Sequence, residues 1–357
     1  MQVDFIIVGQ GLVGSAVALQ LLKRNRKILV IDKPLANSSS RIAVGLFNPI
    51  TGRNLVKTWM ADTLFPYLQT FYQDAEVLTQ KRFFYPLSLY RPFGSIEEQN
   101  EWMAKSADPI YEGYVENIFP KSTLASVKDH FGGLFLKKCG YLDTIQYIDA
   151  VRTVIDSKGI LLEEVFQDDL LRIRNTSVRY KDYEASHVIF CQGIESNTCT
   201  WFKWVPVLAL KGETIRIQSD HSENIIINRG VYAVPVNQNG IWRVGATYSL
   251  TDKVQNITAL AREELTSKMN ELVKFPYTVI DQEWGIRPTT HDRRPILGRH
   301  PEHQVLHILN GMGPKGVSLS PYFSEILVKT IENQHSLNKD VDIERYKLLY
   351  WSPSTRI

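Results

Sequence analysis

The sequence predicts two kinds of architecture in one chain (α/β plus α+β): an α/β domain on a parallel sheet, and an inserted, mainly antiparallel β-sheet domain. Three observations predict it. A glycine-rich turn joins an apolar strand to a helix at the N-terminus. The strand–glycine pattern recurs twice further along the chain. A series of short strands separated by turns begins near Val205.

The first element is the stretch VDFIIVGQGLVG, which is typical of a buried strand, a tight turn and the start of a helix. Gly9, Gly11 and Gly14 fit the G-x-G-x-x-G spacing, and an amphipathic helix is predicted over 13–23. The glycines allow a tight turn, close backbone approach to a pyrophosphate and close packing of helix on strand. Free N–H groups at the helix N-terminus favour an anion.

The next strand, KILVID, ends at Asp32, where an acidic side chain can bind a ribose 2′-hydroxyl. The turn alone is a weak signal, because a glycine-rich strand-to-helix turn can be purely structural. Together with both strands and the helix, it predicts a bound adenine dinucleotide. These features do not distinguish one dinucleotide from another.

The segment that follows, PLANSSSRIAVGLFNPITGR, is polar and then rich in small residues. It fits either a mobile surface loop or a loop that continues along a diphosphate and passes close to a flat ring. Helical spacing predicts a helix over 56–72. We expect a strand over 84–93, with its alternating aromatic residues in the core. Residues 94–138 show no clear pattern.

A helix is predicted over 144–157, closed by Gly159, and the strand ILLEEVF follows it. A buried strand over 187–191 then ends at Gly193, which repeats the pattern of the opening. Strands and helices in this order predict a parallel sheet that is built from separated pieces of the chain.

From Val205 onward the pattern predicts an antiparallel sheet, with a hairpin turn at NQNG, which ends in Asn239-Gly240. A helix over 257–273 interrupts the sheet, and a strand over 277–288 returns to it. The strand VLHILN, the turn GMGPKG and a helix over 319–333 form a third strand–glycine–helix unit.

Composition excludes several classes of protein. The 357 residues carry a net charge of +3, which is too small to indicate a nucleic-acid or membrane partner. Three cysteines without metal-like spacing suggest a reducing compartment and no metal site. We find neither a signal peptide nor an apolar run of transmembrane length, so we expect a cytoplasmic protein with no membrane partner.

In order along the chain, the motifs resemble the D-amino-acid oxidase family of flavoenzymes, and most closely its glycine oxidase and sarcosine oxidase branch. The resemblance extends to the flavin-dependent oxidase half of bifunctional tRNA-uridine modification enzymes. It covers nearly the whole chain. The matching pieces are IIVGQGLVGSAVALQL, LVID, SSSRIAVGL, GYLDTIQYIDA, VIFCQG, LALKGETIRI, YAVPVNQNG, VGATYSL, GIRPTTHDRRPILGR and NGMGPKGVSLSP.

The resemblance implies a Rossmann-like FAD-binding domain with FAD as the cofactor. It places that domain at 1–82, 139–204 and 285–357, and a substrate-binding domain at 83–138 and 205–284. No cysteine lies in the glycine turns beside the flavin, so we expect non-covalent attachment. The implied FAD-binding residues are Gly9, Gly11, Leu12, Val13, Gly14, Asp32, Lys33, Ser40, Arg41, Ala43, Val44, Gly45, Val165, Gly193, Gly212, Gly311, Met312, Gly313, Pro314, Lys315, Gly316 and Val317.

Four residues are implied at the substrate. Arg287, in GIRP, corresponds to an arginine that grips a carboxylate, for which a planar guanidinium is suited; the alternative is a structural salt bridge. Tyr232 and Tyr248 are candidates for the same carboxylate, or ordinary sheet tyrosines. Lys315 would contact substrate or reduced flavin, or be a solvated loop lysine. We assign no catalytic base, since hydride transfer requires none.

The chain departs from the family pattern at several positions, which puts substrate identity and oxygen reactivity in doubt. Asp32 stands where glutamate is usual, and Met312 where histidine is frequent. Cys191 and Gln192 replace small residues, and arginines occupy 293 and 294, where a glycine is common.

The implied reaction is oxidation of the C–N bond of a small amino acid or secondary amine by hydride transfer to flavin N5, which gives an imine. The alternatives are oxidation of a carboxymethylaminomethyl group on tRNA, a nicotinamide-dependent dehydrogenase, and a non-catalytic FAD-binding protein. The first alternative needs a nucleic-acid partner, which the charge does not favour. The substrate's identity and stereochemistry, the electron acceptor and assembly into a homo-oligomer are left open.

Overall fold

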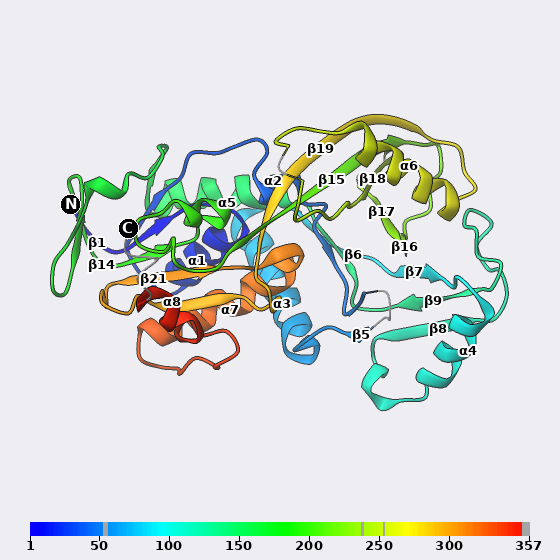
Figure 1. Ribbon diagram of the computed structural model, residues 1–357, viewed down its shortest axis with the longest axis horizontal. Coiled ribbons are helices and arrows are strands. Elements are labelled where there is room, and N and C mark those ends of the chain that lie inside the picture. Colours follow the sequence, from blue (N-terminus) through cyan, green and yellow to red (C-terminus); the bar gives the residue numbers. More distant parts are fainter. Residues whose placement is uncertain (53–55, 237–238, 253, 352–357) are drawn as a thin grey trace.

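The computed structural model describes residues 1–52, 56–236, 239–252 and 254–351. Two large sheets organise the chain. Figure 1 shows the first sheet with its helices at one end of the molecule and the second sheet at the other. The long strands β15 (Leu208–Gln218) and β19 (Thr278–Thr289) extend from the first part toward the second.

The first sheet has the order β11-β2-β1-β14-β13-β12, and β21 and β20 continue it from the second half of β14. Neighbours among β11, β2, β1, β14 and β21 are parallel. The strands are β1 Gln2–Val8, β2 Ile28–Ile31, β11 Ile160–Leu162, β12 Leu171–Ile173, β13 Val178–Tyr180, β14 Tyr183–Phe190, β20 Ile296–Arg299 and β21 Leu306–Asn310.

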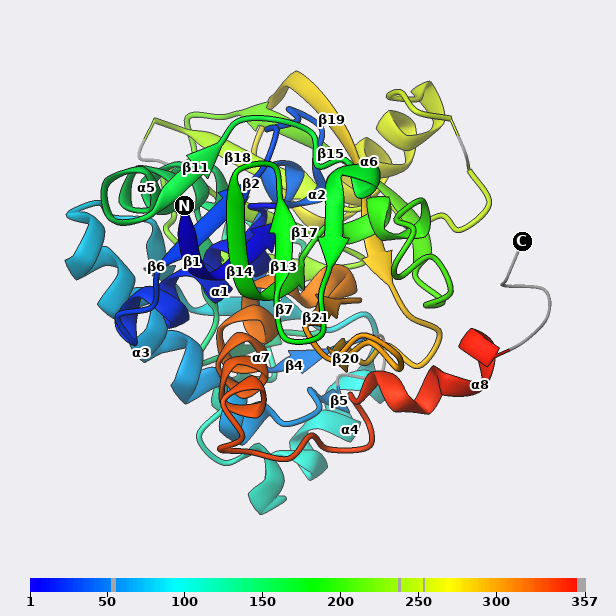
Figure 2. The same ribbon diagram turned by 90° about the vertical axis from the view of Figure 1, so that its left-hand side faces the viewer.

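Both faces of this sheet are covered, which is why its central strands are almost entirely apolar. Ile7 and Val30 lie in a core cluster with residues of the helices α1 Leu12–Lys23, α3 Ala61–Thr79, α5 Thr144–Lys158 and α7 Gly316–Ile331. Ile6 and Leu29 lie in a second cluster on the opposite face, with Phe202. Figure 2 shows the helices gathered beside the sheet.

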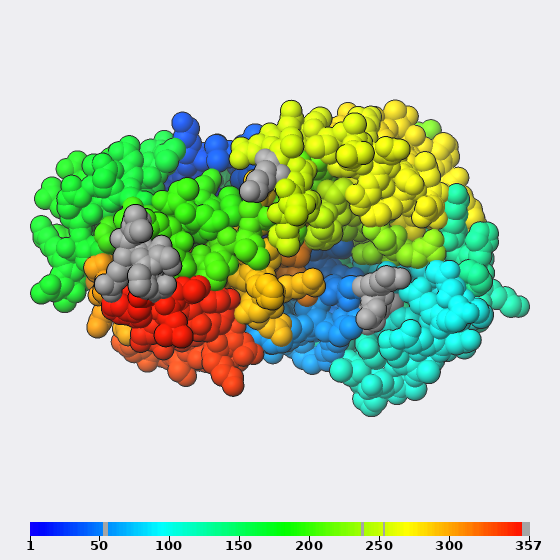
Figure 3. Space-filling model, viewed as in Figure 1, coloured from blue at the N-terminus to red at the C-terminus, as the bar shows by residue number. Residues whose placement is uncertain are grey.

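The second sheet has the order β19-β15-β18-β17-β16-β7-β9-β8 and is antiparallel except between β16 and β7. Its further strands are β7 Leu89–Pro92, β8 Val115–Phe119, β9 Gly133–Leu136, β16 Ile226–Arg229, β17 Val231–Pro235 and β18 Ile241–Gly245. Helix α6 (Ala259–Leu272) packs on it through a third core cluster. In Figure 3, α6 (yellow) and the cyan segment around α4 (Ile96–Lys105) lie on opposite sides of one end of the molecule.

Short elements connect the two parts. A three-stranded sheet has the order β3 (Leu46–Phe47), β10 (Gly140–Leu142), β6 (Phe84–Pro86), and β4 (Ile50–Thr51) pairs with β5 (Val56–Lys57). The remaining helices are α2 Ser39–Ile42, α8 Lys347–Trp351 and the 3₁₀ turns Pro109–Tyr111, Asp168–Leu170, Gly193–Asn197, Gly313–Lys315 and Ile343–Tyr346.

The structure confirms the predicted fold class. The helices predicted over 13–23, 144–157 and 257–273 are α1, α5 and α6, and Gly159 is the C-cap of α5. Strands β17 and β18 pair antiparallel, as the predicted hairpin requires, but Asn237 and Gln238 of the predicted turn lie outside the described residues.

Four element predictions were wrong in detail. The predicted strand ILLEEVF ends at Leu162, the last residue of β11 that pairs with β2. Residues 56–57 form the strand β5 because they pair with β4, and the helix begins at Ala61 instead. The expected strand over 84–93 is two strands in two different sheets, β6 paired with β10 and β7 paired with β9. The last helix begins at Gly316, inside the glycine turn itself. The expected aromatic core is nevertheless present, since Phe84 and Tyr90 are buried.

The predicted division into domains remains a prediction. Its boundary at 284/285 falls inside β19, and the boundary at 82/83 falls just before β6. Within the described part of the chain, every helix is too short or too polar to cross a membrane.

Candidate active site

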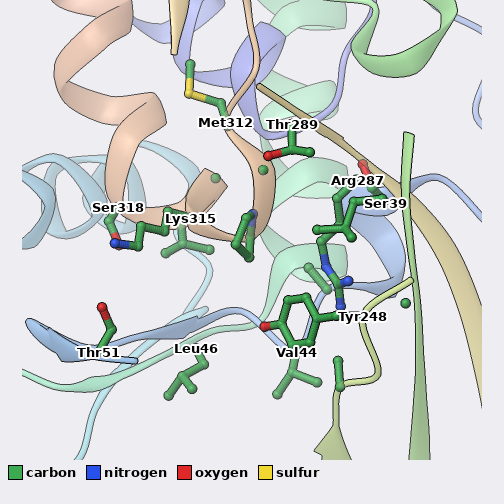
Figure 4. Close-up of a pocket in the computed structure, with 18 of the residues that line it drawn as sticks. Ser39, Val44, Leu46, Thr51, Tyr248, Arg287, Thr289, Met312, Lys315 and Ser318 are labelled. Carbon is green, nitrogen blue, oxygen red and sulfur yellow. The ribbon is translucent and has the colours of Figure 1, made fainter. Parts of the chain in front are cut away.

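A cavity of about 1430 Å³ lies between the two large sheets. Its lining residues come from segments far apart in the chain, from Gly11 near the N-terminus to Ser318 in α7. Figure 4 shows Arg287 and Tyr248 on one side of this cavity and Lys315 and Ser318 on the other, with Val44 and Leu46 below them in the view.

The N-terminal glycine turn provides one end of the cavity. Gly9 has φ +92°, which favours glycine, and a Cβ atom on Gly14 would lie 1.9 Å from the carbonyl oxygen of Gly9. The helix α1 therefore packs tightly against the turn. No side chain of its N-cap residue, Gly11, satisfies the first N–H groups of the helix, and Gly11, Leu12 and Val13 line the cavity. This end can bind an anion through backbone N–H groups.

A second helix N-terminus faces the same cavity. The whole turn from Gly311 to Val317 lines it, and α7 begins at Gly316 without a side-chain cap. Gly311 and Gly313 have φ values of +75° and +53°. The two helix N-termini, α1 and α7, therefore both direct their positive ends to one cavity, and α1 packs beside α7.

The small-residue segment after β2 forms the wall between these ends. Ser40, Ala43, Val44 and Gly45 line the cavity, and the Leu12 N–H donates to Ser40 Oγ at 3.1 Å. A Cβ on Gly45 would lie 1.9 Å from the carbonyl oxygen of Leu142. The absence of a side chain at Gly45 is therefore what lets this segment pass so close to Leu142.

Arg287 extends from β19 into the cavity. A Cβ on Gly212, in the neighbouring strand, would lie 2.0 Å from Arg287 Nη1, so this glycine provides the space that the guanidinium occupies. The guanidinium lies over the ring of Tyr248, 4.9 Å from its centroid, and Nη1 donates a long hydrogen bond of 3.4 Å to the Thr247 carbonyl. Among the described residues, no carboxylate lies within ion-pair distance of it.

Tyr232 lines the same part of the cavity from β17. Burial and, to a smaller extent, Tyr248 raise the pKa of the Tyr232 phenol, while Arg287 and Arg243 oppose the rise. The phenol is therefore neutral at pH 7 and has a proton to donate. Arg287, Tyr232 and Tyr248 together form a donor group that suits a carboxylate.

Lys315 lies in the second glycine turn, across the cavity from Arg287 (Figure 4). Burial, and then the neighbouring guanidinium groups of Arg294 and Arg293, lower the pKa of its ammonium group. Arg293 also lines the cavity, and Arg294 stacks on Trp59, with its guanidinium 4.0 Å from the ring centroid. This side of the cavity is therefore basic.

The structure brings most predicted site residues into one cavity, but it places six of them outside its lining. Gly9 and Gly14 do not line the cavity, but they allow α1 to pack closely against the first glycine turn. Asp32 accepts a hydrogen bond from the Gln10 N–H (2.8 Å) and pairs with Arg152 (3.2 Å). Lys33 and Val165 are exposed, and Arg41 pairs with Asp149. Gly212 does line the cavity, and a Cβ added to it would lie against Arg287.

Sequence reasoning missed several lining residues. Leu208, Leu210 and Thr214 share the alternating face of β15 with Gly212, so the period of two along the predicted strand would have found them. Thr289 and Thr290 follow the GIRP motif directly and also line the cavity. Asn48 and Thr51 carry no comparable sequence signal, because short strands bring them there.

These residues fit a dinucleotide such as FAD. Two helix N-termini whose N-cap residues provide no side-chain hydrogen bond suit the pyrophosphate and an electron-rich ring edge, and the small residues between them leave room for an extended molecule. The described part of the chain contains no cluster of His, Cys, Asp or Glu that could hold a metal ion.

Comparisons with known proteins agree with this geometry. The sequence profile described as "FAD dependent oxidoreductase" (DAO) matches residues 4–330. A curated relative, the tRNA 5-methylaminomethyl-2-thiouridine biosynthesis bifunctional protein MnmC of Marinobacter nauticus, is 24% identical over 92% of this chain and 55% of its own length. The bifunctional protein ThiO/ThiG of Synechocystis is 23% identical over 93% of this chain and 52% of its own. The chain thus spans about half the length of these relatives.

Solved structures share the fold. Glycine oxidase from Geobacillus kaustophilus has a TM-score of 0.79 at 20% identity, over 94% of this chain and 96% of its own. Iminodiacetate oxidase from Chelativorans has a TM-score of 0.79 at 17% identity, over 96% of this chain and 98% of its own.

Proposed function

We propose, from the premise that this chain belongs to the family of FAD-dependent oxidoreductases, that it oxidises the C–N bond of a small amino acid or secondary amine to an imine. The observation that carries the proposal is Arg287: a guanidinium in the cavity without a carboxylate partner among the described residues. A substrate carboxylate would supply that partner.

The residues that would hold FAD are those of the two glycine turns and of the segment 40–45. Acceptance of a hydride from the carbon that bears the amine is the chemistry that bound FAD supplies. The chain's own residues bind and orient the substrate: Arg287 and the phenols of Tyr232 and Tyr248 hold its carboxylate. The basic side of the cavity, with Lys315 and Arg293, favours the neutral form of the substrate amine because it repels a second cation.

The test is anaerobic reduction of the purified holoprotein by a panel of amino acids and N-methyl amines. We expect at least one carboxylate-bearing amine to bleach the visible flavin absorption band, and the same amine without its carboxylate to fail. Bleaching by nicotinamide cofactors alone, or by no amine at all, would contradict the proposal and favour a different dehydrogenase or a non-catalytic FAD-binding protein.

A second candidate is oxidation of a carboxymethylaminomethyl group on tRNA. The names of the MnmC relatives support it, and so does the basic character of the cavity wall, where Arg229, Arg287, Arg293 and Lys315 are among the lining residues. The carboxymethylamino group resembles an N-substituted glycine, so Arg287 would have the same role. Bleaching by tRNA that carries this group, but by no free amino acid, would favour this candidate.

Three further statements remain predictions: non-covalent attachment of FAD, a cytoplasmic location and assembly into a homo-oligomer. Release of the flavin on acid precipitation of the protein would test the first. Size-exclusion chromatography with light scattering would test the third.

A further inference from the structure

Arg243, on β18 of the antiparallel sheet, makes contacts that extend beyond its own sheet. Its Nη2 donates to the carbonyl oxygen of Ile42 at 2.7 Å, and its Nη1 donates to that of Ala43 at 3.1 Å. Only 9% of the residue is exposed. An arginine of the second sheet is therefore bonded to two successive carbonyls of a segment that follows β2 in the first.

These two carbonyls lie where the segment reaches the cavity. Ala43 is the C-cap of α2, and Ala43, Val44 and Gly45 line the cavity. The other hydrogen bonds that hold the segment come from the FAD-binding part: Thr144 Oγ1 donates to the Ala43 carbonyl at 3.1 Å, and the Leu142 N–H donates to that of Gly45 at 3.0 Å. Arg243 thus supplies an anchor from the opposite side.

A carboxylate fixes the direction of this arginine. Arg243 Nη2 pairs with Glu283 Oε2 at 2.8 Å, and the other oxygen of Glu283 accepts from Arg216 Nη2 at 2.6 Å. The three residues lie on the neighbouring strands β18, β19 and β15. Burial lowers the pKa of Arg243 and Glu283 opposes this, so the side chain stays charged and its planar donor fork is held in one orientation.

We propose that Arg243 is a positioning residue that joins the antiparallel sheet to the segment 42–45 and so sets where this wall of the FAD cavity stands. The proposal rests on the FAD-dependent family and not on the substrate class proposed above.

The test compares three purified variants: R243M, which removes the guanidinium; R243K, which keeps the charge but not the fork; and R216Q as the matched control. Arg216 shares Glu283 but forms no hydrogen bond to the segment. The readouts are FAD affinity, by titration of the apoprotein, and amide hydrogen exchange of the holoprotein. We expect R243M to weaken FAD binding about tenfold or more and to speed exchange selectively in 40–47. R243K should show smaller changes in both, and R216Q should resemble the wild type.

A folded R243M variant with wild-type FAD affinity and unchanged exchange in 40–47 would overturn the proposal. If R243M fails to fold, the R243K variant provides the test. A lysine ammonium group cannot form the two carbonyl hydrogen bonds and the Glu283 ion pair in the planar arrangement of a guanidinium. Unchanged exchange in 40–47 of R243K would therefore also overturn the proposal. Equal effects of R216Q and R243K would show a general loss of stability and also count against it. None of these readouts requires a substrate, so failure of the proposed reaction would leave them intact.

Discussion

The guanidinium of Arg287 is held by a tyrosine face and one long hydrogen bond, which is little for a charged group inside a cavity. Such a group gains most from a ligand with opposite charge and matching planar geometry. Replacing Arg287 with alanine should therefore weaken binding of small carboxylate inhibitors by about 10- to 100-fold while FAD stays bound. Inhibition constants and the flavin spectrum, measured on the same preparation, check this. Unchanged inhibition constants would refute the assigned role.

Gly212 offers a more local test of the same site. A methyl group at this position would lie 2.0 Å from Arg287 Nη1, and the guanidinium would have to move because the backbone cannot. We expect Gly212→Ala to raise the KM for a carboxylate substrate about tenfold with little change in thermal stability. Equal KM values in the wild type and Gly212→Ala would exclude this role.

At the residue scale, motif spacing predicted the parts of the cavity that are shaped by the backbone. The glycine turns and the segment around Ser40 do line one cavity. Motif spacing could not predict the partners of side chains. Nothing local in the sequence shows that Arg243 forms a hydrogen bond with Ile42, about 200 positions away. Such contacts depend on how two sheets are placed, which no local pattern encodes.

At the scale of elements, buried histidines lie on or next to β20 and β21, outside the lining of the cavity. His300 follows β20 and is 4% exposed, and His307 on β21 bonds His187 at 3.2 Å. Burial, and then His303, lower the pKa of His300 from 6.5 to about 4, and burial lowers that of His307 well below its usual value. These rings are therefore neutral in the folded protein at pH 7.

A pH dependence of stability follows. The pKa of His300 is lower in the folded protein than in the unfolded chain. The contribution of His300 to the free energy of unfolding is therefore complete above pH 6.5 and is lost as the pH falls toward about 4. The loss from this residue should be about 3 kcal/mol. We expect His300→Asn, which keeps an acceptor for the Glu302 and His303 N–H groups, to show a shallower decline in unfolding free energy over this range. Denaturant titrations at several pH values would measure it, and parallel curves for both proteins would contradict it.

Helices and strands with a strong local period were predictable, and those that depend on distant partners were not. The amphipathic pattern and Gly159 locate α5 within one residue. The stretch FYPLSLYRPF has one continuous strand-like pattern, yet Phe84 and Leu89 enter different sheets because their partners, β10 and β9, come from elsewhere in the chain. Pairing of this kind is a tertiary effect.

At the scale of the whole molecule, one hydrophobic core cluster includes residues from both sheets. It contains Ile7 and Val30 of the first sheet together with Leu89, Leu134 and Ile226 of the second. Two parts that share a core lose their stability together. The sequence predicted the two architectures correctly, but a single core between them could not be read from the pattern of either part.

We therefore expect cooperative unfolding of the holoprotein in denaturant. Far-ultraviolet circular dichroism, tryptophan fluorescence and flavin release should give coincident transitions with one midpoint. Separate midpoints for flavin release and for loss of β structure would show that the two sheets unfold independently, and would contradict the shared core as a unit of stability.

The wall of the cavity begins at Gly11 and is completed only by residues near Ser318. Synthesis on the ribosome proceeds from the N-terminus, so the first glycine turn is made long before the second. FAD consequently meets a half-built site throughout most of translation, and the complete cradle exists only once the N-terminus of α7 has left the exit tunnel. The complete cradle for the cofactor therefore cannot form before the chain has been made as far as α7.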